Sequence, residues 1–411
     1  MTRCGLDQLL DERIDTLRGR RFGLLCHAAS VSSRLEHALD ALLARGATPH
    51  RLFGPEHGLD GAAQDMVAVA AARRGAPRDI ELISLYGSDE ASLSPPPGSL
   101  DGLDLLLVDL QDVGSRYYTY VWTMVLAMQA CARAGVAVWV LDRPNPLGGR
   151  AIEGPGIEPP CISFVGLHDM PVRHGLTAGE IASLCRAERT IDVELEVITM
   201  QAWRRAALFD ELDLPWVMPS PNMPTLETAL VYPGGCLYEG TNLSEGRGTT
   251  RPFEIVGAPY LDGRAFAERL TRFELEGVRF RALSFQPTFQ KHSGTVCGGV
   301  QIHVTDRARF APLRCGVAVM LAAAELSGGV GQAALDERFA WRAAPYEFVS
   351  DRPAIDLLAG GAWLREGIEA NLALDALCAP WRDSEARFAE RRRAHLLYAD
   401  DHRADNDGVG R

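Results

Sequence analysis

Residues 103–116 read LDLLLVDLQDVGSR, and this stretch decides how the fold is interpreted. Its first part, residues 103–110, is a continuous apolar run that only Asp104 and Asp109 interrupt. Such runs are typical of parallel strands whose two faces are both buried. The run ends at a polar turn that contains Asp112 and Gly114. We therefore expect a buried parallel strand here, with chemically active side chains following its carboxyl end.

Strand and helix signals alternate along the rest of the first half of the chain. Further strands are predicted at residues 21–26, 50–53, 81–86, 136–141 and 194–199. Helical patterns separate them, at residues 35–45, at residues 118–134, and after Thr177, where Glu180 completes a capping box. Strands and helices that alternate at these lengths predict an α/β fold with a Rossmann-like, doubly wound parallel sheet.

The pattern changes near residue 258. A helix at 263–272, strands at 279–285 and 300–304, and a helix at 310–326 predict a smaller C-terminal α+β auxiliary domain. A chain of 411 residues is also too long for one typical core. We expect a Rossmann-like catalytic domain over residues 1–258, an auxiliary domain over residues 259–398 that closes the cleft, and a disordered tail over residues 399–411.

Composition excludes several classes of partner. The net charge is −12 and no long Lys/Arg run occurs, which argues against a nucleic acid partner. No window approaches the ~18 apolar residues of a membrane span, so no membrane partner is expected. The nine cysteines form no C-x-x-C pair, and the N-terminus lacks the apolar core of a signal peptide. These features predict a cytoplasmic protein with free thiols. The oligomeric state is left open.

Cofactor and metal motifs are missing from the sequence. No G-x-G-x-x-G follows a predicted strand, and no G-x-x-x-x-G-K-[ST] occurs, so no cofactor is expected. The histidines at 57, 168, 174, 292 and 303 show no metal-ligand spacing, which predicts no metal. A G-x-S-x-G nucleophile elbow is also absent. Carboxylate chemistry remains as the main possibility.

Four carboxylates lie on Gly-rich loops, at Glu56, Asp112, Glu239 and Glu245. Ionisable side chains that converge on loops favour an active site over purely structural turns. Two carboxylates flanking a scissile bond are the equipment of a glycoside hydrolase. The alternative interpretation is that the Pro-Glu-His-Gly turn at residues 55–58 is only a capped turn and that residues 238–252 form a solvated Ω-loop.

Seven ordered motifs resemble those of the NamZ family of bacterial exo-β-N-acetylmuramidases. They are FGPEHG (53–58), DLQDVGSRYYTY (109–120), DRPNPLGG (142–149), GLHDMPVRHGLTAGE (166–180), MPSPNMPT (218–225), EGTNLSEGRGTTRPFE (239–254) and CGGVQIHVTD (297–306). The resemblance spans residues 5–398. It implies hydrolysis of terminal, non-reducing β-1,4-linked N-acetylmuramic acid from peptidoglycan fragments, in a cleft between a Rossmann-like domain and an auxiliary domain. The loop at 26–30, CHAAS, departs from the Asn/Thr-containing turn of the family, which weakens any role for it.

The resemblance also suggests roles for individual residues. The family's favoured catalytic glutamate falls on Glu56, which we expect to be the general acid, because its apolar neighbour Phe53 would favour the protonated form. The second carboxylate is expected to be Asp112, Glu239 or Glu245. The predicted substrate-binding residues are His57, Arg116, Tyr117, Tyr118, Asn222, Asn242, Arg247 and Arg251.

Alternatives remain open at this point. The substrate is expected to be a muropeptide or a saccharide of N-acetylmuramic acid and N-acetylglucosamine, whose lactyl carboxylate would meet a guanidinium from Arg116, Arg247 or Arg251. Hydrolysis could retain the anomeric configuration, invert it, or use the substrate's own acetamido group as nucleophile. Other functions considered are hydrolysis of a β-N-acetylglucosaminide and non-catalytic muropeptide binding.

Overall fold

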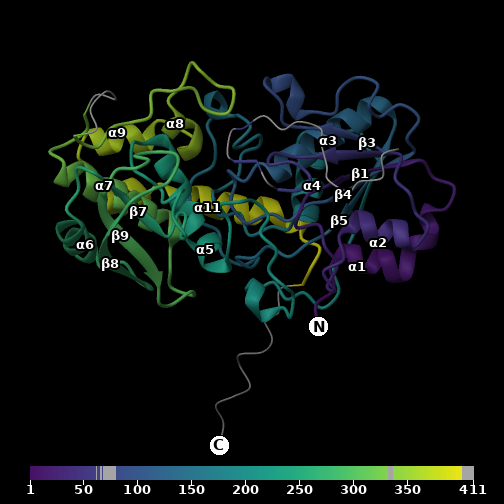
Figure 1. Ribbon diagram of the computed structural model, residues 1–411, viewed down its shortest axis with the longest axis horizontal. Coiled ribbons are helices and arrows are strands. Elements are labelled where there is room, and N and C mark those ends of the chain that lie inside the picture. The colour runs from purple at the N-terminus through teal and green to yellow at the C-terminus, as the bar shows by residue number, and fades with distance from the viewer. Residues whose placement is uncertain (62, 65–66, 68–79, 332–336, 400–411) are drawn as a thin grey trace, which may run out of the picture.

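The computed structural model describes residues 1–61, 63–64, 67, 80–331 and 337–399. Figure 1 shows two lobes, one around a parallel sheet and one around the helix α7. The predicted tail at residues 399–411 lies outside the described residues from residue 400 onward. None of the helices in the described part combines the length and the hydropathy that crossing a lipid bilayer requires.

Six parallel strands form the sheet of the first domain, in the order β3-β2-β1-β4-β5-β6. The order reverses between β1 and β4, as it does in doubly wound folds that bind ligands at this switch point. The predicted α/β class and parallel sheet are therefore confirmed. The strands are β1 (Phe22–Cys26), β2 (Arg51–Gly54), β3 (Glu81–Ser84), β4 (Leu105–Asp109), β5 (Ala137–Leu141) and β6 (Leu195–Ile198).

Alternate residues of β4 pack into two separate apolar cores. Leu105 and Leu107 join the core on the side of α1 and α2, whereas Leu106 and Val108 join the core on the side of α3 and α4. All of β4 is buried, which explains its continuous apolar sequence. The helices of this domain are α1 (Gly5–Gln8), α2 (Ala38–Ala44), α3 (Tyr120–Ala134) and α4 (Ala178–Glu188).

The second domain is built on a three-stranded antiparallel sheet in the order β7-β9-β8. The predicted α+β character is confirmed. The strands are β7 (Ile255–Ala258), β8 (Val278–Phe285) and β9 (Cys297–Val304). The helices are α5 (Leu226–Gly235), α6 (Gly263–Thr271), α7 (Pro312–Leu326), α8 (Ala354–Ala359), α9 (Trp363–Glu369), α10 (Leu374–Cys378) and α11 (Trp381–Arg392).

The start of one predicted strand in this domain was wrong, and strand pairing bears on the domain boundary. Strand β9 begins at Cys297, before the predicted residue 300, because Gly298 and Gly299 carry no apolar side chain yet pair with β7. A Cβ atom on Gly257 would lie 2.2 Å from the carbonyl oxygen of Gly298, so the two strands approach too closely for a side chain there. Since β7 pairs with β9, the predicted domain boundary after residue 258 falls directly behind a strand of the second sheet. This pairing favours a domain boundary ahead of β7.

Residues 153–157, which we call the strap, connect the two domains. The Glu153 carboxylate accepts a hydrogen bond from the backbone N–H of Arg314, in the first turn of α7, at 2.9 Å. Backbone N–H groups of the strap donate to Glu385 at 2.8 Å and to Ser384 at 2.9 Å, both on α11. Polar groups of the strap thus satisfy partners on two helices of the second domain.

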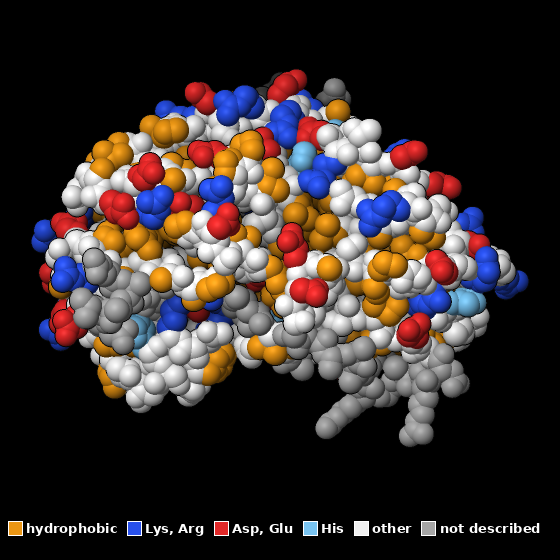
Figure 2. All heavy atoms as spheres, turned by 90° about the horizontal axis from the view of Figure 1, so that it is seen from above, with side chains coloured by type: hydrophobic (Ala, Val, Ile, Leu, Met, Phe, Trp, Pro, Cys, Tyr) orange, Lys and Arg blue, Asp and Glu red, His pale blue; other side chains and the backbone are white. Residues whose placement is uncertain are grey.

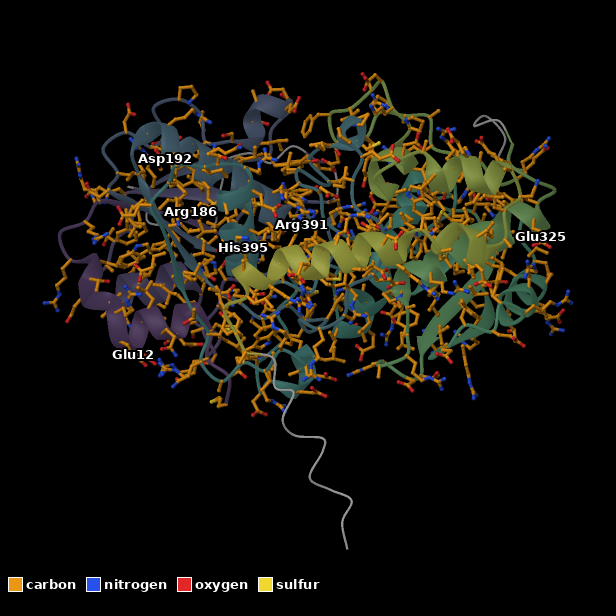
Figure 3. All side chains as sticks on the ribbon, turned by 180° about the vertical axis from the view of Figure 1, so that it is seen from behind. Glu12, Arg186, Asp192, Glu325, Arg391 and His395 are labelled. Atoms are coloured by element: carbon orange, nitrogen blue, oxygen red, sulfur yellow. The ribbon has the colours of Figure 1, made fainter. Side chains whose placement is uncertain are left out.

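Helix α11 crosses the back of the molecule and reaches the first domain (Figure 3). Near its end, Arg391 forms ion pairs with Glu188 at 2.5 Å and with Asp169 at 2.9 Å. The His395 ring lies 3.3 Å from the hydroxyl of Ser183 on α4. The last described helix of the chain therefore packs against the domain in which the chain begins.

Asp142, directly after β5, joins segments from the two ends of the described chain. Its carbonyl oxygen accepts a hydrogen bond from Gly5 N at 2.8 Å. Its carboxylate accepts from the Tyr398 hydroxyl at 2.5 Å, from the Thr177 hydroxyl at 2.8 Å and from Gly179 N at 2.8 Å. Burial raises the pKa of Asp142 to about 6, against these hydrogen bonds.

Replacing Glu153 with Gln is expected to stabilise the protein at alkaline pH. Burial raises the pKa of Glu153 from 4.5 to about 7, against the hydrogen bond from Arg314 N. The pKa of Glu153 is higher in the folded state than in the unfolded state. The contribution of Glu153 to the stability of the fold is therefore complete below about pH 4.5 and is lost as the pH rises through 7. The Gln amide keeps the acceptor for Arg314 and carries no charge. We expect Glu153→Gln to exceed the wild type by about 1–3 kcal/mol at pH 8 and to match it near pH 5.

Urea unfolding at the two pH values measures this difference. The matched control is Glu158→Gln, which removes an exposed carboxylate five residues further along the chain and should leave stability unchanged at either pH. A stability difference between wild type and Glu153→Gln that does not grow with pH would contradict the assignment.

Candidate active site

A narrow cavity lies where the two domains meet, beyond the carboxyl ends of the parallel strands. This is the position at which doubly wound sheets bind ligands. Both domains contribute to its wall. The lining residues are Glu56, His57, Tyr117, Tyr118, Thr119, Tyr120, Val165, Ser220, Asn222, Met223, Tyr232, Glu239, Arg247, Phe253, Tyr346 and Glu347.

Glu56 reaches this cavity from the turn that follows β2. The next two residues, His57 and Gly58, have φ of 67° and 78°, which turns the chain sharply after the strand. The Glu56 side chain is only 4% exposed, and its carboxyl accepts a hydrogen bond from the Thr119 hydroxyl at 2.7 Å. Thr119 is the residue from which α3 starts, so a rigid element holds the carboxyl in place.

His57 both lines the cavity and anchors the turn. Its Nδ1 lies 2.9 Å from the carbonyl oxygen of Ala63. The ring meets Tyr120 edge-on, with centroids 6.3 Å apart. His57 was predicted to bind substrate, and the structure places it in the cavity wall while its ring also contacts the backbone of its own turn.

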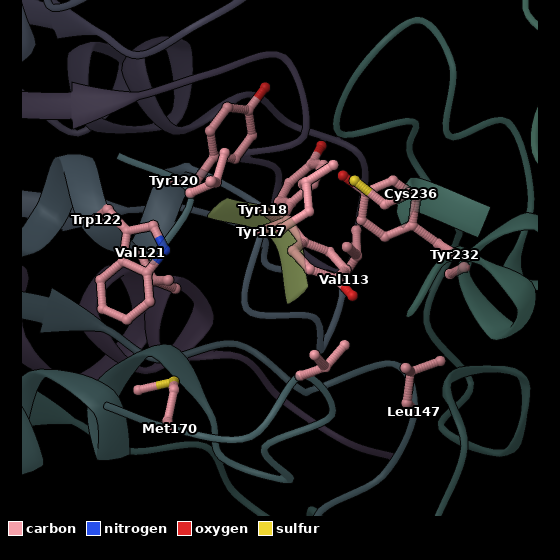
Figure 4. Packing of buried hydrophobic residues seen from close by; sticks show 14 of the residues in the cluster. Val113, Tyr117, Tyr118, Tyr120, Val121, Trp122, Leu147, Met170, Tyr232 and Cys236 are labelled. Carbon is pink, nitrogen blue, oxygen red and sulfur yellow. The ribbon is translucent and has the colours of Figure 1, made fainter. Parts of the chain in front are cut away.

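Tyr117, Tyr118 and Tyr120 line the cavity, and Figure 4 shows their side chains among the buried residues around them. The hydroxyl of Tyr117 donates to the carbonyl of Pro233 at 3.0 Å, and that of Tyr120 donates to Pro219 at 2.7 Å. Burial raises the pKa of Tyr117, Tyr118 and Tyr120 well above the ordinary value. These phenols therefore stay protonated. The protons of Tyr117 and Tyr120 are donated to backbone carbonyls, so these two residues offer a sugar ligand their ring faces and acceptor oxygens.

A cluster of two carboxylates and two cations closes one side of the cavity. Arg247 donates through Nη1 to Glu239 at 2.7 Å and to Glu245 at 3.1 Å, and Lys291 donates to Glu245 at 2.9 Å. Burial alone would raise the pKa of Glu245, but Lys291 and Arg247 outweigh it and hold this pKa at about 2. Glu239 also accepts from the Tyr346 hydroxyl at 2.6 Å. Of the four, Glu239 and Arg247 line the cavity.

The cavity wall also includes Tyr346 and Glu347 of the second domain, which sequence reasoning missed. The carboxyl of Glu347 is 4% exposed and accepts a hydrogen bond at 3.0 Å from the hydroxyl of Tyr86, which follows β3 in the first domain. Glu347 and Phe348 have φ of 44° and 67°. Residues 345–350 read PYEFVS and contain no glycine or charged motif, so no local signal marks this stretch.

Two of the predicted second carboxylates do not line the cavity. Asp112 is buried beside it, where its Oδ2 accepts from Gly114 N at 2.6 Å and lies 3.5 Å from His174. These contacts fix the turn after β4. Glu245 is held by the two cations described above. Only Glu239 of the three predicted candidates faces the cavity.

Arg116 was predicted to bind substrate, and the structure places it elsewhere. Its guanidinium is buried and donates to the carbonyl oxygens of Pro155, Met170 and Leu358 at 2.8–3.0 Å. Burial lowers the pKa of Arg116 to about 10. Leu358 lies on α8, so Arg116 joins the strap to the second domain and is not part of the cavity wall.

The other predicted binding residues divide in the same way. Asn222 lines the cavity and donates to Gln64 at 2.9 Å. Asn242 lies outside it, where its side chain accepts from Tyr260 and donates to the carbonyl of Arg338. Arg251 is about half exposed, pairs with Glu254 and does not line the cavity either. The sequence alone does not distinguish an Asn or Arg that lines the cavity from one that is held by partners elsewhere, because those partners are known only from the fold.

The loop after β1, which departs from the family pattern, supports the site from behind. The His27 ring accepts a hydrogen bond from Gln111 N at 3.0 Å and lies 3.3 Å from the carbonyl of Pro219. Burial, reinforced by Arg143, lowers the pKa of His27 well below its ordinary value, so the ring is neutral. His27 therefore joins the turns that follow β1 and β4 to the loop that carries Ser220, and it does not line the cavity.

Known proteins match this chain over almost its whole length. The model described as "Exo-beta-N-acetylmuramidase NamZ, N-terminal" matches residues 22–227, and the corresponding C-terminal model matches residues 230–398. The junction of the two models lies at the start of α5, ahead of the predicted boundary at residue 258. A protein of Bacillus subtilis (strain 168), named peptidoglycan β-N-acetylmuramidase NamZ, is 42% identical over 398 residues, which cover 96% of this chain and 91% of that protein.

Solved structures agree with this match. A DUF1343 family protein from Bacteroides fragilis NCTC 9343 superimposes with a TM-score of 0.84 at 28% identity, covering 97% of this chain and 99% of its own. A second DUF1343 family protein from the same organism gives a TM-score of 0.75 at 27% identity, covering 98% and 100%. The two-domain architecture is therefore shared.

Proposed function

This chain belongs to the NamZ family of exo-β-N-acetylmuramidases and is an exo-acting glycoside hydrolase of peptidoglycan, and we propose that Glu56 is the general acid of its reaction. One observation carries the proposal. Glu56 is the buried carboxyl that a strand-end turn directs into the cavity and that the start of α3 holds in place. An acid needs a fixed position at the leaving group, and both elements provide it.

In the proposed reaction Glu56 donates its proton to the glycosidic oxygen as the bond from that oxygen to the anomeric carbon breaks. The released fragment leaves with a neutral hydroxyl, and water adds to the anomeric carbon. The substrates are terminal, non-reducing β-1,4-linked N-acetylmuramic acid residues of muropeptides or of saccharides with N-acetylglucosamine. The tyrosine hydroxyls and Asn222 lie where they can contact sugar hydroxyl and acetamido groups.

We propose that the Arg247 guanidinium binds the lactyl carboxylate of the substrate. It is the guanidinium among the described lining residues, whereas Arg116 and Arg251 lie outside the cavity. A guanidinium pairs with a carboxylate more strongly than neutral donors do. N-acetylmuramic acid carries this carboxylate and N-acetylglucosamine does not, so Arg247 would provide the preference for muramic acid.

Chromogenic β-N-acetylmuramide and β-N-acetylglucosaminide, assayed side by side with and without EDTA, test the function. We expect release from the muramide, about 10-fold or more slower release from the glucosaminide, and no effect of EDTA. Preference for the glucosaminide would favour a different hydrolase. Saturable muropeptide binding without turnover would favour a binding protein. In the described residues no three His, Cys, Asp or Glu side chains are grouped as metal ligands.

We also propose that the enzyme acts in the cytoplasm, on fragments taken up during peptidoglycan recycling. All nine cysteines lie in the described residues as free thiols, and eight of them are buried. Unpaired cysteines are typical of a reducing compartment. Figure 2 shows acidic and basic side chains intermingled on one face, without a basic stripe for nucleic acid. Fractionation of the cells, with the activity assayed in each fraction, would contradict the location if most activity were found outside the cytoplasm.

A further inference from the structure

We infer that Glu347, supplied by the second domain, is the second carboxylate of the active site and acts as the base toward the attacking water. The inference rests on the proposed function and extends it to a residue outside the seven motifs that identify the family. Among the described lining residues the cavity has three carboxyl groups, at Glu56, Glu239 and Glu347. Glu56 comes from the first domain, and Glu347 approaches from the second.

Glu239 is the less suitable of the two remaining carboxylates. One of its oxygens receives Nη1 of Arg247 at 2.7 Å, and the other receives the hydroxyl of Tyr346 at 2.6 Å. Both carboxylate oxygens of Glu239 therefore take part in contacts that hold the wall of the cavity together. Its contacts make Glu239 the residue that holds Arg247 and Tyr346 in position.

The contacts of Glu347 reach into the first domain. It is buried, and its Oε2 accepts the hydroxyl of Tyr86 at 3.0 Å across 261 residues of sequence. The Tyr86 ring packs against Phe348 and Phe164, with centroids 5.6 and 6.1 Å apart. A hydroxyl donor orients the carboxylate, and aromatic rings from both domains fix the donor. The position of Glu347 over the cavity is therefore set by contacts between the domains.

The backbone at Glu347 is strained in a way that points to function. Tyr346 and Val349 exchange two backbone hydrogen bonds of 2.9 and 3.0 Å, so Glu347 and Phe348 form the centre of a two-residue hairpin. Both central residues have positive φ, at 44° and 67°, as in a type I′ turn. Such turns strongly favour Asn-Gly, because β-carbon atoms are strained there, at a cost of about 1–3 kcal/mol per residue. Strain of this kind clusters at active sites and ligand clamps, so a Glu-Phe pair in this turn points to a function for the Glu347 side chain.

The chemistry balances with this assignment. Glu56 gives its proton to the glycosidic oxygen while the bond from that oxygen to the anomeric carbon breaks. Water forms the new bond to the same carbon and gives a proton to the carboxylate of Glu347. One glycosidic bond and one O–H bond of water are replaced by two hydroxyl groups. Proton exchange with solvent then returns Glu56 to the acid form and Glu347 to the carboxylate, and no oxidant or cofactor is needed.

Glu347→Gln is the first test, because it keeps the shape of the side chain and removes the base. We expect kcat to fall by about 10²–10⁴ on the natural disaccharide and by a similar factor on an activated aryl muramide. The aryl substrate is not spared, because an activated leaving group needs no acid but still needs an attacking water. Glu254→Gln is the matched control, since Glu254 is a buried carboxylate of the same domain outside the cavity. It should keep the wild-type kcat.

Azide rescue of Glu347→Ala gives a second, independent measurement. Azide is already an anion and needs no base, so it should restore the rate on the aryl muramide and yield the α-configured muramyl azide, identified by NMR. A folded Glu347→Gln enzyme with kcat near wild type would overturn the inference. A change confined to KM, or no azide product from a slow Glu347→Ala enzyme, would also overturn it. Wild-type release of muramic acid in the same assay shows that the proposed function stands in each of these cases.

Discussion

Replacing Glu56 with Gln is expected to lower kcat on the natural disaccharide by about 10²–10⁴. The amide keeps the shape of the side chain and can still contact the hydroxyl of Thr119, which is 2.7 Å away in the wild type. It has no proton to give to the leaving oxygen. The loss should be much smaller on a muramide with an activated aryl leaving group, because that group departs without protonation. Steady-state kinetics on both substrates measure the contrast.

The roles proposed for Glu56 and Glu347 predict different losses of kcat on the aryl substrate, so the comparison of the two variants separates an acid from a base. Glu56→Gln should spare the aryl substrate, whereas Glu347→Gln should not. Glu153→Gln is the control for Glu56, since it removes a buried carboxylate of the first domain away from the cavity and should leave kcat unchanged. Near wild-type hydrolysis of the disaccharide by Glu56→Gln would make Glu56 a structural turn residue and would direct the search for the acid to Glu239.

Arg247→Met is expected to cause the largest loss of stability, about 3–5 kcal/mol at pH 7. One nitrogen of Arg247 donates to both Glu239 and Glu245, and all three side chains are buried. Methionine fills much of the same volume and leaves two carboxylates in a poorly solvated site. Lys291 still pairs with Glu245, so Glu239 bears most of the cost. Urea unfolding at pH 7 measures the change in the free energy of unfolding.

The same variant should also change the acid dependence of stability. The pKa of Glu245 is held at about 2, below its ordinary 4.5, so its contribution is present above pH 4.5 and is lost as the pH falls toward 2. Without Arg247 this loss should become smaller. Arg251→Met is the control, because its pair with Glu254 is partly exposed and should contribute only about 0–1 kcal/mol. Equal losses for the two variants would contradict the role of the buried cluster.

The sheet and the turn that carries Glu56 could be predicted because their signals are local. The apolar run of β4 indicates burial on both faces of the sheet, and the glycines around Glu56 indicate a sharp turn. Helix α5 was missed because Pro233 and two glycines interrupt its pattern. The glycine at 234 is needed there, since a Cβ atom would lie 2.0 Å from the carbonyl oxygen of Pro312 on α7.

Residues that act across the domain junction could not be predicted from local patterns. Glu347 occupies a hairpin turn whose residues, Glu and Phe, are not those that mark such turns in a sequence. Arg116 lies in a motif rich in polar groups, but only the folded chain shows that three carbonyl oxygens occupy its guanidinium. A sequence lists donors and acceptors. Which of them meet depends on contacts between distant segments.

The hydrogen bonds of Asp142 have a consequence for synthesis of the protein on the ribosome. Asp142 and the Tyr398 hydroxyl that it binds are separated by 256 residues, so this partner is made long after the sheet residues have emerged. Until then the nascent first domain holds a buried carboxylate without one of its donors, at a position where such a group is costly. An expressed fragment that stops at the junction of the two family models would keep this defect permanently. The parallel sheet therefore reaches its final stability only when the residues that follow α11 have been translated and have returned to it.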